Sequence, residues 1–170
     1  MSNHWKLAVG IAAVGGALAM VGLGGPGSPR DNLAAIDLTL DAMHEFAAKA
    51  DEDRYFDLYT PDAIFLGTDA TERWTIEQFK EYAMPIFTQR EVGWVYTPTS
   101  RHIILGAGGD TAWFDETLVN AKYGACRGSG VLVKTAGGWK IAQYNLTVPI
   151  PNDLLEQVAG MIREHENAAP

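Results

Sequence analysis

Apolar residues recur at every third or fourth position near the start of the folded part of the chain, which is the spacing of an amphipathic helix. Within the segment 32–49 these positions are Leu33, Ile36, Leu40, Met43 and Phe46/Ala47. Asp31 precedes the segment and can cap it. The pattern predicts a first helix from about Asn32 to Lys49.

Two further helices are predicted before the middle of the chain. DEDRYFDLY (51–59) opens with acidic residues, which stabilise a helix N-terminus. TIEQFKEYAMPIF (75–87) begins with a capping box made of Thr75 and Gln78. Pro85 is expected to kink or end this helix, because proline lacks the backbone donor that a helix interior needs.

From Trp94 onward the apolar pattern changes to the period of strands, with glycine-rich turns between β-branched and aromatic segments. The predicted strands are WVYTPTSRHIIL (94–105), TAWFDETLVNAKY (111–123), CRGSGVLVK (126–134) and GWKIAQYNLTVP (138–149). Pro98 predicts an edge position or a bulge in the first of them. AIFLG (63–67) is a short earlier strand, followed by a loop, and a last helix begins at Asn152. Helices followed by an antiparallel meander define an α+β fold.

The hairpin between the last two strands sets which side chains share a face. A three-residue loop (135–137) with Gly137 in the left-handed conformation is expected. It pairs Val133 with Trp139, Val131 with Ile141, Ser129 with Gln143, and Arg127 with Asn145. A two-residue loop would place Val133 opposite Lys140 and is rejected because it conflicts with burial.

This register gives one sheet face that is apolar near the turn and polar at its far end. The polar end carries Arg127, Ser129, Gln143 and Asn145. Two interpretations remain open. The polar groups can emerge into water, or helices can arch over them and leave a pocket in which water or a ligand satisfies their hydrogen bonds.

The order of elements, ending in GGWKIAQYNLT, resembles the nuclear transport factor 2-like superfamily, in particular its SnoaL-like branch. The resemblance covers residues 31–152 and is most specific in R-x-S-x-V-L-V-K-x-x-G-G-W-K-I (127–141). It implies a strongly bent antiparallel sheet wrapped around the N-terminal helices, forming a cone with a cavity, and a homodimer through the outer sheet face. The superfamily includes ketosteroid isomerases, scytalone dehydratase and polyketide cyclases, so its fold does not fix one function.

Asp69 and Asp115 are the candidate catalytic residues, as a base after the short strand and a second acid on the meander. The alternatives are that Asp69 forms its own turn and that Asp115 pairs with Arg101 across strands. Asp115 and Glu116 are adjacent and must point to opposite faces, so one of them is expected to enter the core. Asn145 stands where many relatives carry a histidine, and an amide cannot exchange protons at neutral pH.

The candidate ligand-binding residues are Trp74, His102, Trp113, Arg127, Ser129, Gln143 and Asn145. Trp74 can equally anchor the next helix, and His102 can be structural. His44 and His102 lie in no zinc-binding spacing, and there is no glycine-rich phosphate loop, so neither a metal nor a cofactor is predicted. The single cysteine, Cys126, is expected to be a small buried group.

Length and charge restrict the class of protein. The chain has 170 residues, enough for one domain, and a formal net charge of −8. Residues 30–170 carry 12 basic and 21 acidic side chains without a basic cluster, which argues against nucleic-acid binding.

Residues 1–29 read as a signal peptide or N-terminal membrane anchor with a Gly/Pro linker: Lys6, an apolar stretch and then GGPGSP. Ala17-Leu18-Ala19 offers a cleavage site, and a glycine-rich cytoplasmic helix is the alternative. Residues 30–152 would form the SnoaL-like domain and 153–170 a C-terminal helix and tail. The predicted protein is periplasmic or secreted and touches a membrane only through its N-terminal segment.

The predicted function is that of an exported SnoaL-like domain that binds a small, partly apolar molecule in the cone cavity. Proton transfer of the isomerase or lyase type is one version of this hypothesis. A non-catalytic module that dimerises or binds a protein partner through its sheet is the alternative.

Overall fold

A computed structural model of the protein describes residues 27–89 and 93–168. The elements are α1 (Pro29–Ala48), α2 (Glu52–Asp57), β1 (Tyr59–Leu66), β2 (Arg73–Thr75), α3 (Ile76–Gln89), β3 (Thr97–Leu105), β4 (Thr111–Asn120), β5 (Gly124–Thr135), β6 (Gly138–Thr147), a short 3-10 turn η1 (Asn152–Leu154) and α4 (Leu155–Ala168). The predicted signal or anchor segment lies outside the described residues except for residues 27–29.

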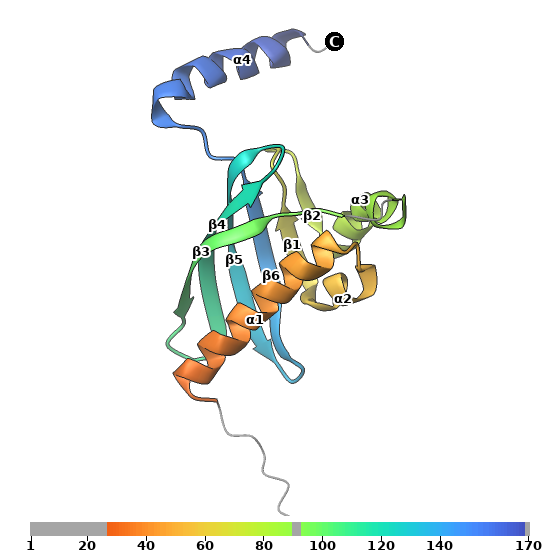
Figure 1. The fold of residues 1–170 in the computed structure, drawn as a ribbon, viewed down its shortest axis with the longest axis vertical. Coiled ribbons are helices and arrows are strands. Elements are labelled where there is room, and N and C mark those ends of the chain that lie inside the picture. Colours follow the sequence, from red (N-terminus) through yellow and green to blue (C-terminus); the bar gives the residue numbers. More distant parts are fainter. Residues whose placement is uncertain (1–26, 90–92, 169–170) are drawn as a thin grey trace, which may run out of the picture.

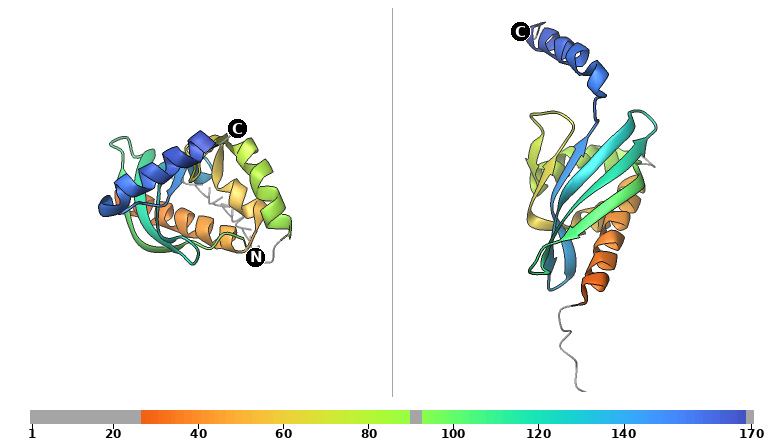
Figure 2. Two further views of the ribbon diagram at one scale, coloured as in Figure 1. Left: turned by 90° about the horizontal axis from the view of Figure 1, so that it is seen from above. Right: turned by 90° about the vertical axis from the view of Figure 1, so that its left-hand side faces the viewer.

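The strands form one bent sheet in the order β2-β1-β6-β5-β4-β3. Helix α1 lies across its concave face, while α2 and α3 close one side (Figures 1 and 2). The predicted α+β cone is confirmed. One pairing is parallel, that of β1 with β6, and it joins strands far apart in sequence. Hairpin signals report only neighbours along the chain, so the sequence did not indicate this pairing.

The ends of the helices follow local capping chemistry. Helix α1 begins at Pro29, three residues before the predicted start at Asn32, and Ser28 is its cap. The Ser28 hydroxyl accepts a hydrogen bond from the Asp31 backbone N–H at 3.2 Å. Asp31 is therefore the reciprocal partner in the box, and its prediction as the cap was wrong. At α3 the predicted box is confirmed, because the Thr75 hydroxyl accepts from the Gln78 backbone at 3.3 Å.

Two prolines were expected to disturb their helix or strand, and only one of these expectations is fully met. Pro85 lies inside α3, which continues to Gln89, so it does not end the helix. Pro98 lies on β3, an edge strand of the sheet, and the register shifts between Pro98 and Ser100. Both the edge position and the bulge predicted for Pro98 are confirmed.

The hairpin between β5 and β6 differs from the expected one. Thr135 pairs with Gly138 across a two-residue loop, and Val133 lies opposite Lys140, so the rejection of this register from the sequence was wrong. The positive φ of 108° belongs to Gly138 and not to Gly137.

A β-bulge in β6 explains why this register is compatible with burial. Leu132 pairs with Ile141 and the next residue, Val131, pairs with Gln143, which leaves Ala142 without a partner. An extra residue on one strand reverses its alternation. Side chains before the bulge point inward at odd positions, and those after it point inward at even positions, as the buried Ile141 and Tyr144 show. The polar residues after the bulge therefore face outward.

The core lies between α1 and the concave sheet face. Its fully buried side chains include Ile36, Leu40, Phe79, Leu118, Leu132 and Ile141. On β5 the buried positions alternate as Cys126, Gly128, Gly130 and Leu132. Cys126 is free and buried, as predicted. Gly130 is needed because a Cβ there would lie 2.1 Å from the Gln143 carbonyl oxygen.

The C-terminal helix α4 stands away from the cone (Figure 1). It buries none of its residues, and apolar side chains such as Leu155, Met161 and Ile162 are exposed on it. Within residues 27–89 and 93–168, no helix is both long and apolar enough to cross a membrane.

Candidate functional site

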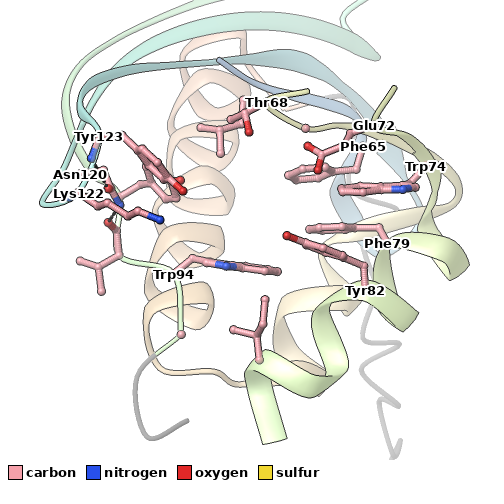
Figure 3. Close-up of a pocket in the computed structure, with 16 residues that line it drawn as sticks. Phe65, Thr68, Glu72, Trp74, Phe79, Tyr82, Trp94, Asn120, Lys122 and Tyr123 are labelled. Atoms are coloured by element: carbon pink, nitrogen blue, oxygen red, sulfur yellow. Dashed lines mark hydrogen bonds between the residues drawn. The ribbon is translucent and has the colours of Figure 1, made fainter. Parts of the chain in front are cut away.

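A cavity of about 400 Å³ opens at one end of the cone (Figure 3). Five parts of the chain line it: the end of β1 with the following loop and β2, helix α3, the segment 93–96, the turn between β4 and β5, and the end of β6. Of these parts, the sequence indicated a site only in the first, through Trp74, which lies on β2.

One wall of the cavity is built from five aromatic rings, contributed by Phe65, Trp74, Phe79, Tyr82 and Trp94. The rings are nearly parallel: Phe65 and Phe79 lie 3.7 Å apart at 12°, and Phe79 and Trp94 lie 5.8 Å apart at 12°. Trp74 stacks on Tyr82 at 4.7 Å. The rings stack mainly on one another, and Phe79 and Phe65 are only 1% and 7% exposed. Trp74, Tyr82 and Trp94 are the members with surface left for a ligand, and their rings share nearly one orientation.

The opposite rim is the turn that follows β4, and its shape is fixed by Asn120. The Asn120 side-chain oxygen accepts hydrogen bonds from the backbone N–H groups of Lys122 at 2.9 Å and Tyr123 at 3.0 Å. Its amide nitrogen donates to the Val95 carbonyl at 3.0 Å. These bonds tie the turn to the segment that carries Trp94.

A second, smaller space of about 30 Å³ adjoins the cavity at its inner end. Phe65, Tyr96 and Leu146 line both spaces, so the two are neighbours. His44 on α1 and Tyr144 on β6 are among the residues that line the inner space and not the larger cavity. Burial raises the pKa of Tyr96 to about 12, which keeps its hydroxyl protonated.

A buried carboxylate lies behind the inner space. Glu116 on β4 is 1% exposed and accepts three hydrogen bonds from side chains. The His44 Nε2 lies 2.7 Å from its Oε1, the Tyr144 hydroxyl donates to the same oxygen at 3.1 Å, and the Arg101 Nε donates to Oε2 at 2.9 Å. Arg101 also reaches two carboxylates on α1, those of Asp37 at 2.5 Å and Asp41 at 2.8 Å.

These contacts keep Glu116 ionised. Burial by itself raises the pKa of Glu116, but the hydrogen bond from His44, the charge that His44 carries when protonated, and the charge and hydrogen bond of Arg101 outweigh burial and leave this pKa below its usual value. The pKa of Tyr144 is raised, mainly by burial and then by the Glu116 charge, so its hydroxyl remains a donor. A fixed carboxylate beside His44 favours the ring tautomer with the proton on Nε2. The other nitrogen, Nδ1, has no hydrogen-bond partner among the described residues and can accept a proton.

A glycine makes room for this network. A Cβ on Gly128 would lie 2.4 Å from the Tyr144 hydroxyl and 2.7 Å from Glu116 Oε1. Gly128 pairs in register with Glu116, so this inward position of β5 lies beside the carboxylate and has no room for a side chain.

The structure separates the two candidates that follow β1, Asp69 in the loop and Trp74 on β2. Trp74 lines the cavity, as predicted. Asp69 is exposed and its Oδ1 accepts hydrogen bonds from the Thr71 backbone at 2.8 Å and the Thr71 hydroxyl at 2.6 Å. These bonds, the side-chain one first, lower the pKa of Asp69. Asp69 thus forms its own turn, the alternative given above, and its catalytic role stays untested.

The other seven candidates lie on the outer face of the sheet, so the inward position expected for Arg127, Ser129, Gln143 and Asn145 is wrong. Three adjacent cross-strand rows contain them: Ile104-Trp113-Val131-Gln143, His102-Asp115-Ser129-Asn145, and Ser100-Thr117-Arg127-Thr147. Asp115 is therefore the outward member of the Asp115/Glu116 pair and lies 3.3 Å from the exposed His102 instead of pairing with Arg101. The bulge in β6 and the two-residue hairpin loop are the physical reasons.

Sequence reasoning missed His44 and Glu116, although a signal for each was present. Alternate residues of β4 read Ala112, Phe114, Glu116 and Leu118, so Glu116 shares its face with three apolar residues. His44 follows Met43 on the stripe of α1 that packs on the sheet. A histidine and a carboxylate inside two apolar stripes indicate a buried pair.

Two comparisons with known proteins agree with the cone fold. The family model for the SnoaL-like domain matches residues 36–151, more than half of the chain. The protein therefore belongs to the SnoaL-like domain family. No curated protein matches the chain.

Solved structures with the same fold are only distantly similar in sequence. A proposed aromatic ring hydroxylase from Novosphingobium aromaticivorans is 21% identical with a TM-score of 0.61, covering 74% of this chain and 94% of its own. A proposed dehydratase of the nuclear transport factor 2-like family from Streptomyces avermitilis is 16% identical with a TM-score of 0.61, covering 73% and 100%. A proposed scytalone dehydratase from Novosphingobium aromaticivorans is 11% identical with a TM-score of 0.60, covering 71% and 86%. These identities establish the fold and leave the reaction open.

Proposed function

We propose that this SnoaL-like domain binds a small, partly aromatic molecule in the cone cavity and transfers a proton to or from it through His44. The observation that carries the proposal is the 2.7 Å contact of His44 with the buried Glu116, at the inner end of an aromatic-lined cavity. A buried carboxylate whose pKa is shifted by a specific charged partner, beside a cavity, is a candidate for a functional site.

The proposed chemistry is general acid–base catalysis. Glu116 accepts the Nε2–H bond of His44 and holds the ring, so Nδ1 takes a proton from an acidic C–H or O–H group of the ligand. The carboxylate then stabilises the imidazolium, as in other carboxylate–histidine pairs. Arg101 keeps Glu116 charged throughout. Such a pair suits an isomerase or a lyase, and two of the structural neighbours carry the description of proposed dehydratases.

We expect the His44→Gln variant to lose proton transfer and keep binding. The probe is 2-tetralone, a bicyclic aromatic ketone with acidic C–H groups beside its carbonyl. In D₂O the wild-type protein should accelerate deuterium exchange at these groups, measured by NMR. The variant should exchange them about 100-fold more slowly, the usual contribution of a general base.

Binding of 2-tetralone is measured separately through tryptophan fluorescence, since Trp74 and Trp94 line the cavity. The exposed His102 lies on the outer face and provides a matched control, His102→Gln, which should leave exchange unchanged. Binding without accelerated exchange would contradict the proton-transfer step. Absence of binding would contradict the cavity as the ligand site.

A second proposal concerns assembly: the chain forms a homodimer through the outer sheet face. The supporting observation is an apolar cross-strand row on that face, in which Ile104 is 51% and Trp113 is 47% exposed. Exposed aromatic residues on a sheet surface are typical of interfaces.

We expect Trp113→Asp to convert the dimer into a folded monomer, because it places a charge in the middle of that row. Sedimentation equilibrium measures the mass, and circular dichroism checks folding. Leu38→Asp is the matched control, because Leu38 is 68% exposed on α1, away from the outer sheet face. A wild-type monomer at micromolar concentration would contradict this proposal.

Export from the cytoplasm remains a prediction from residues 1–29. It rests on Lys6, the apolar stretch and GGPGSP, and mapping the mature N-terminus would test it.

A further inference from the structure

We infer that the ligand is a planar aromatic anion whose charged group lies at the cavity mouth beside Lys122. The inference rests on the proposed cavity binding and goes further by naming the chemical class of the ligand. Two independent features of the cavity carry it: the common orientation of the aromatic wall and the position of a single cation on the opposite rim.

The aromatic wall favours a flat molecule. Tyr82 and Trp94 lie 6.3 Å apart at 13°, and Phe79 and Trp94 lie within 12° of parallel. A planar ring system can stack against faces that share one orientation, whereas a bulky aliphatic molecule would contact only part of them. A volume of about 400 Å³ is ample for two fused rings and their substituents.

Lys122 is the only Lys, Arg or His among the described residues that line the cavity. Figure 3 shows its side chain reaching from the turn toward the cavity, across from the aromatic wall. Its Nζ lies 4.9 Å from the centre of the Tyr123 ring, a cation–π contact that limits where the amine can go. The turn beneath it is fixed by the Asn120 hydrogen bonds, so the charge occupies a defined place.

The remaining charge of the cavity lies on the other side. Glu72 is the single acid among the lining residues that the structure describes, and its Oε2 accepts a hydrogen bond from the Asp69 backbone at 3.1 Å. Figure 3 places Glu72 on the side of Phe65 and Trp74, away from Lys122. A ligand anion is therefore repelled from one side and attracted to the other, within a protein whose net charge of −8 otherwise disfavours anions.

The two ends of the site give the ligand a direction. The anionic group lies at the mouth, the rings lie along the aromatic wall, and the far end of the molecule points toward His44 in the inner space. This arrangement leaves the reacting atom in the drier part of the cavity, where a proton transfer is least disturbed by water.

The test compares 2-naphthoate with 2-naphthamide, two probes of the same shape that differ in charge. Binding is measured by tryptophan quenching and by calorimetry. The wild-type protein should bind the carboxylate about fivefold more tightly than the amide, the size expected for one partly exposed ion pair. Lys122→Met should remove this preference by weakening the carboxylate alone, and added salt should reduce it in the wild type.

Lys49→Met is the control variant, since this lysine is 60% exposed and pairs with Glu45 without lining the cavity. It should keep the full preference. Equal binding of the two probes, or an unchanged preference in Lys122→Met, would overturn the anion inference and leave cavity binding standing. Failure of both probes to bind would overturn cavity binding as well.

Discussion

Replacing Glu116 with alanine is expected to destabilise the domain by about 3 kcal/mol, because a buried arginine loses its buried partner. The Arg101 side chain is 8% exposed, and its remaining partners, Asp37 and Asp41, are more than half exposed. Their attraction is weakened by solvent, so they cannot replace Glu116. Urea unfolding at pH 7, followed by circular dichroism, measures the change.

Tyr144→Phe is the matched control for this prediction. It removes one hydrogen bond to Glu116 and leaves both charges in place, so it should cost only about 1 kcal/mol. A Glu116→Ala variant as stable as Tyr144→Phe would show that the ion pair contributes little.

The pH dependence gives an independent check with a definite sign. The pKa of Glu116 in the folded protein lies below its ordinary value of 4.5, so the folded state stabilises the carboxylate. That stability is fully present above about pH 4.5 and is lost as the pH falls through the lower, folded pKa. The difference in stability between the wild type and Glu116→Gln should therefore shrink on the acid side of pH 4.5.

Gly128→Ala is expected to destabilise the domain by about 3 kcal/mol, through overpacking and the loss of buried hydrogen bonds. The new Cβ would meet the Tyr144 hydroxyl and the Glu116 carboxylate at contact distances too short to tolerate. Both groups would have to move, so His44 should also lose its partner and proton transfer should slow.

Gly137→Ala provides the control, because a Cβ there meets only the Thr135 hydroxyl at 3.8 Å. It should change the free energy of unfolding by less than about 0.5 kcal/mol, as surface substitutions usually do. Equal effects of the two substitutions would show that the space beside Glu116 is not tightly filled. Because both positions have ordinary φ values, backbone strain does not enter the comparison.

Features governed by neighbours in sequence were predictable. The helices, the capping box at Thr75, the bulge at Pro98 and the four-strand meander all depend on residues within a few positions of each other. Local chemistry decides them before any tertiary contact forms. The α+β cone could be inferred from their order together with the family resemblance.

The candidate site was harder to predict because it depends on which way each strand faces. Because Val131 and Val133 are apolar, the odd-numbered positions of β5 were expected to face inward. The side that does face inward contains Gly128 and Gly130. Glycine carries no hydrophobic signal, so a face built around a buried polar network looks empty in the sequence. Once the face was reversed, every polar candidate on that hairpin moved to the outside.

The extra residue in β6 has a geometric consequence. If Ala142 were deleted, Trp139, Ile141, Tyr144 and Leu146 would still share one face by simple alternation; with Ala142 present, the bulge is what keeps them on that face. What a bulge adds is a local bend and a stronger twist. β6 runs from the hairpin, where Trp139 is in the core, to Leu146 at the cavity, and the bend falls between them. Ala142 does not line the cavity, but the bend that it introduces into β6 contributes to the width of the cavity mouth.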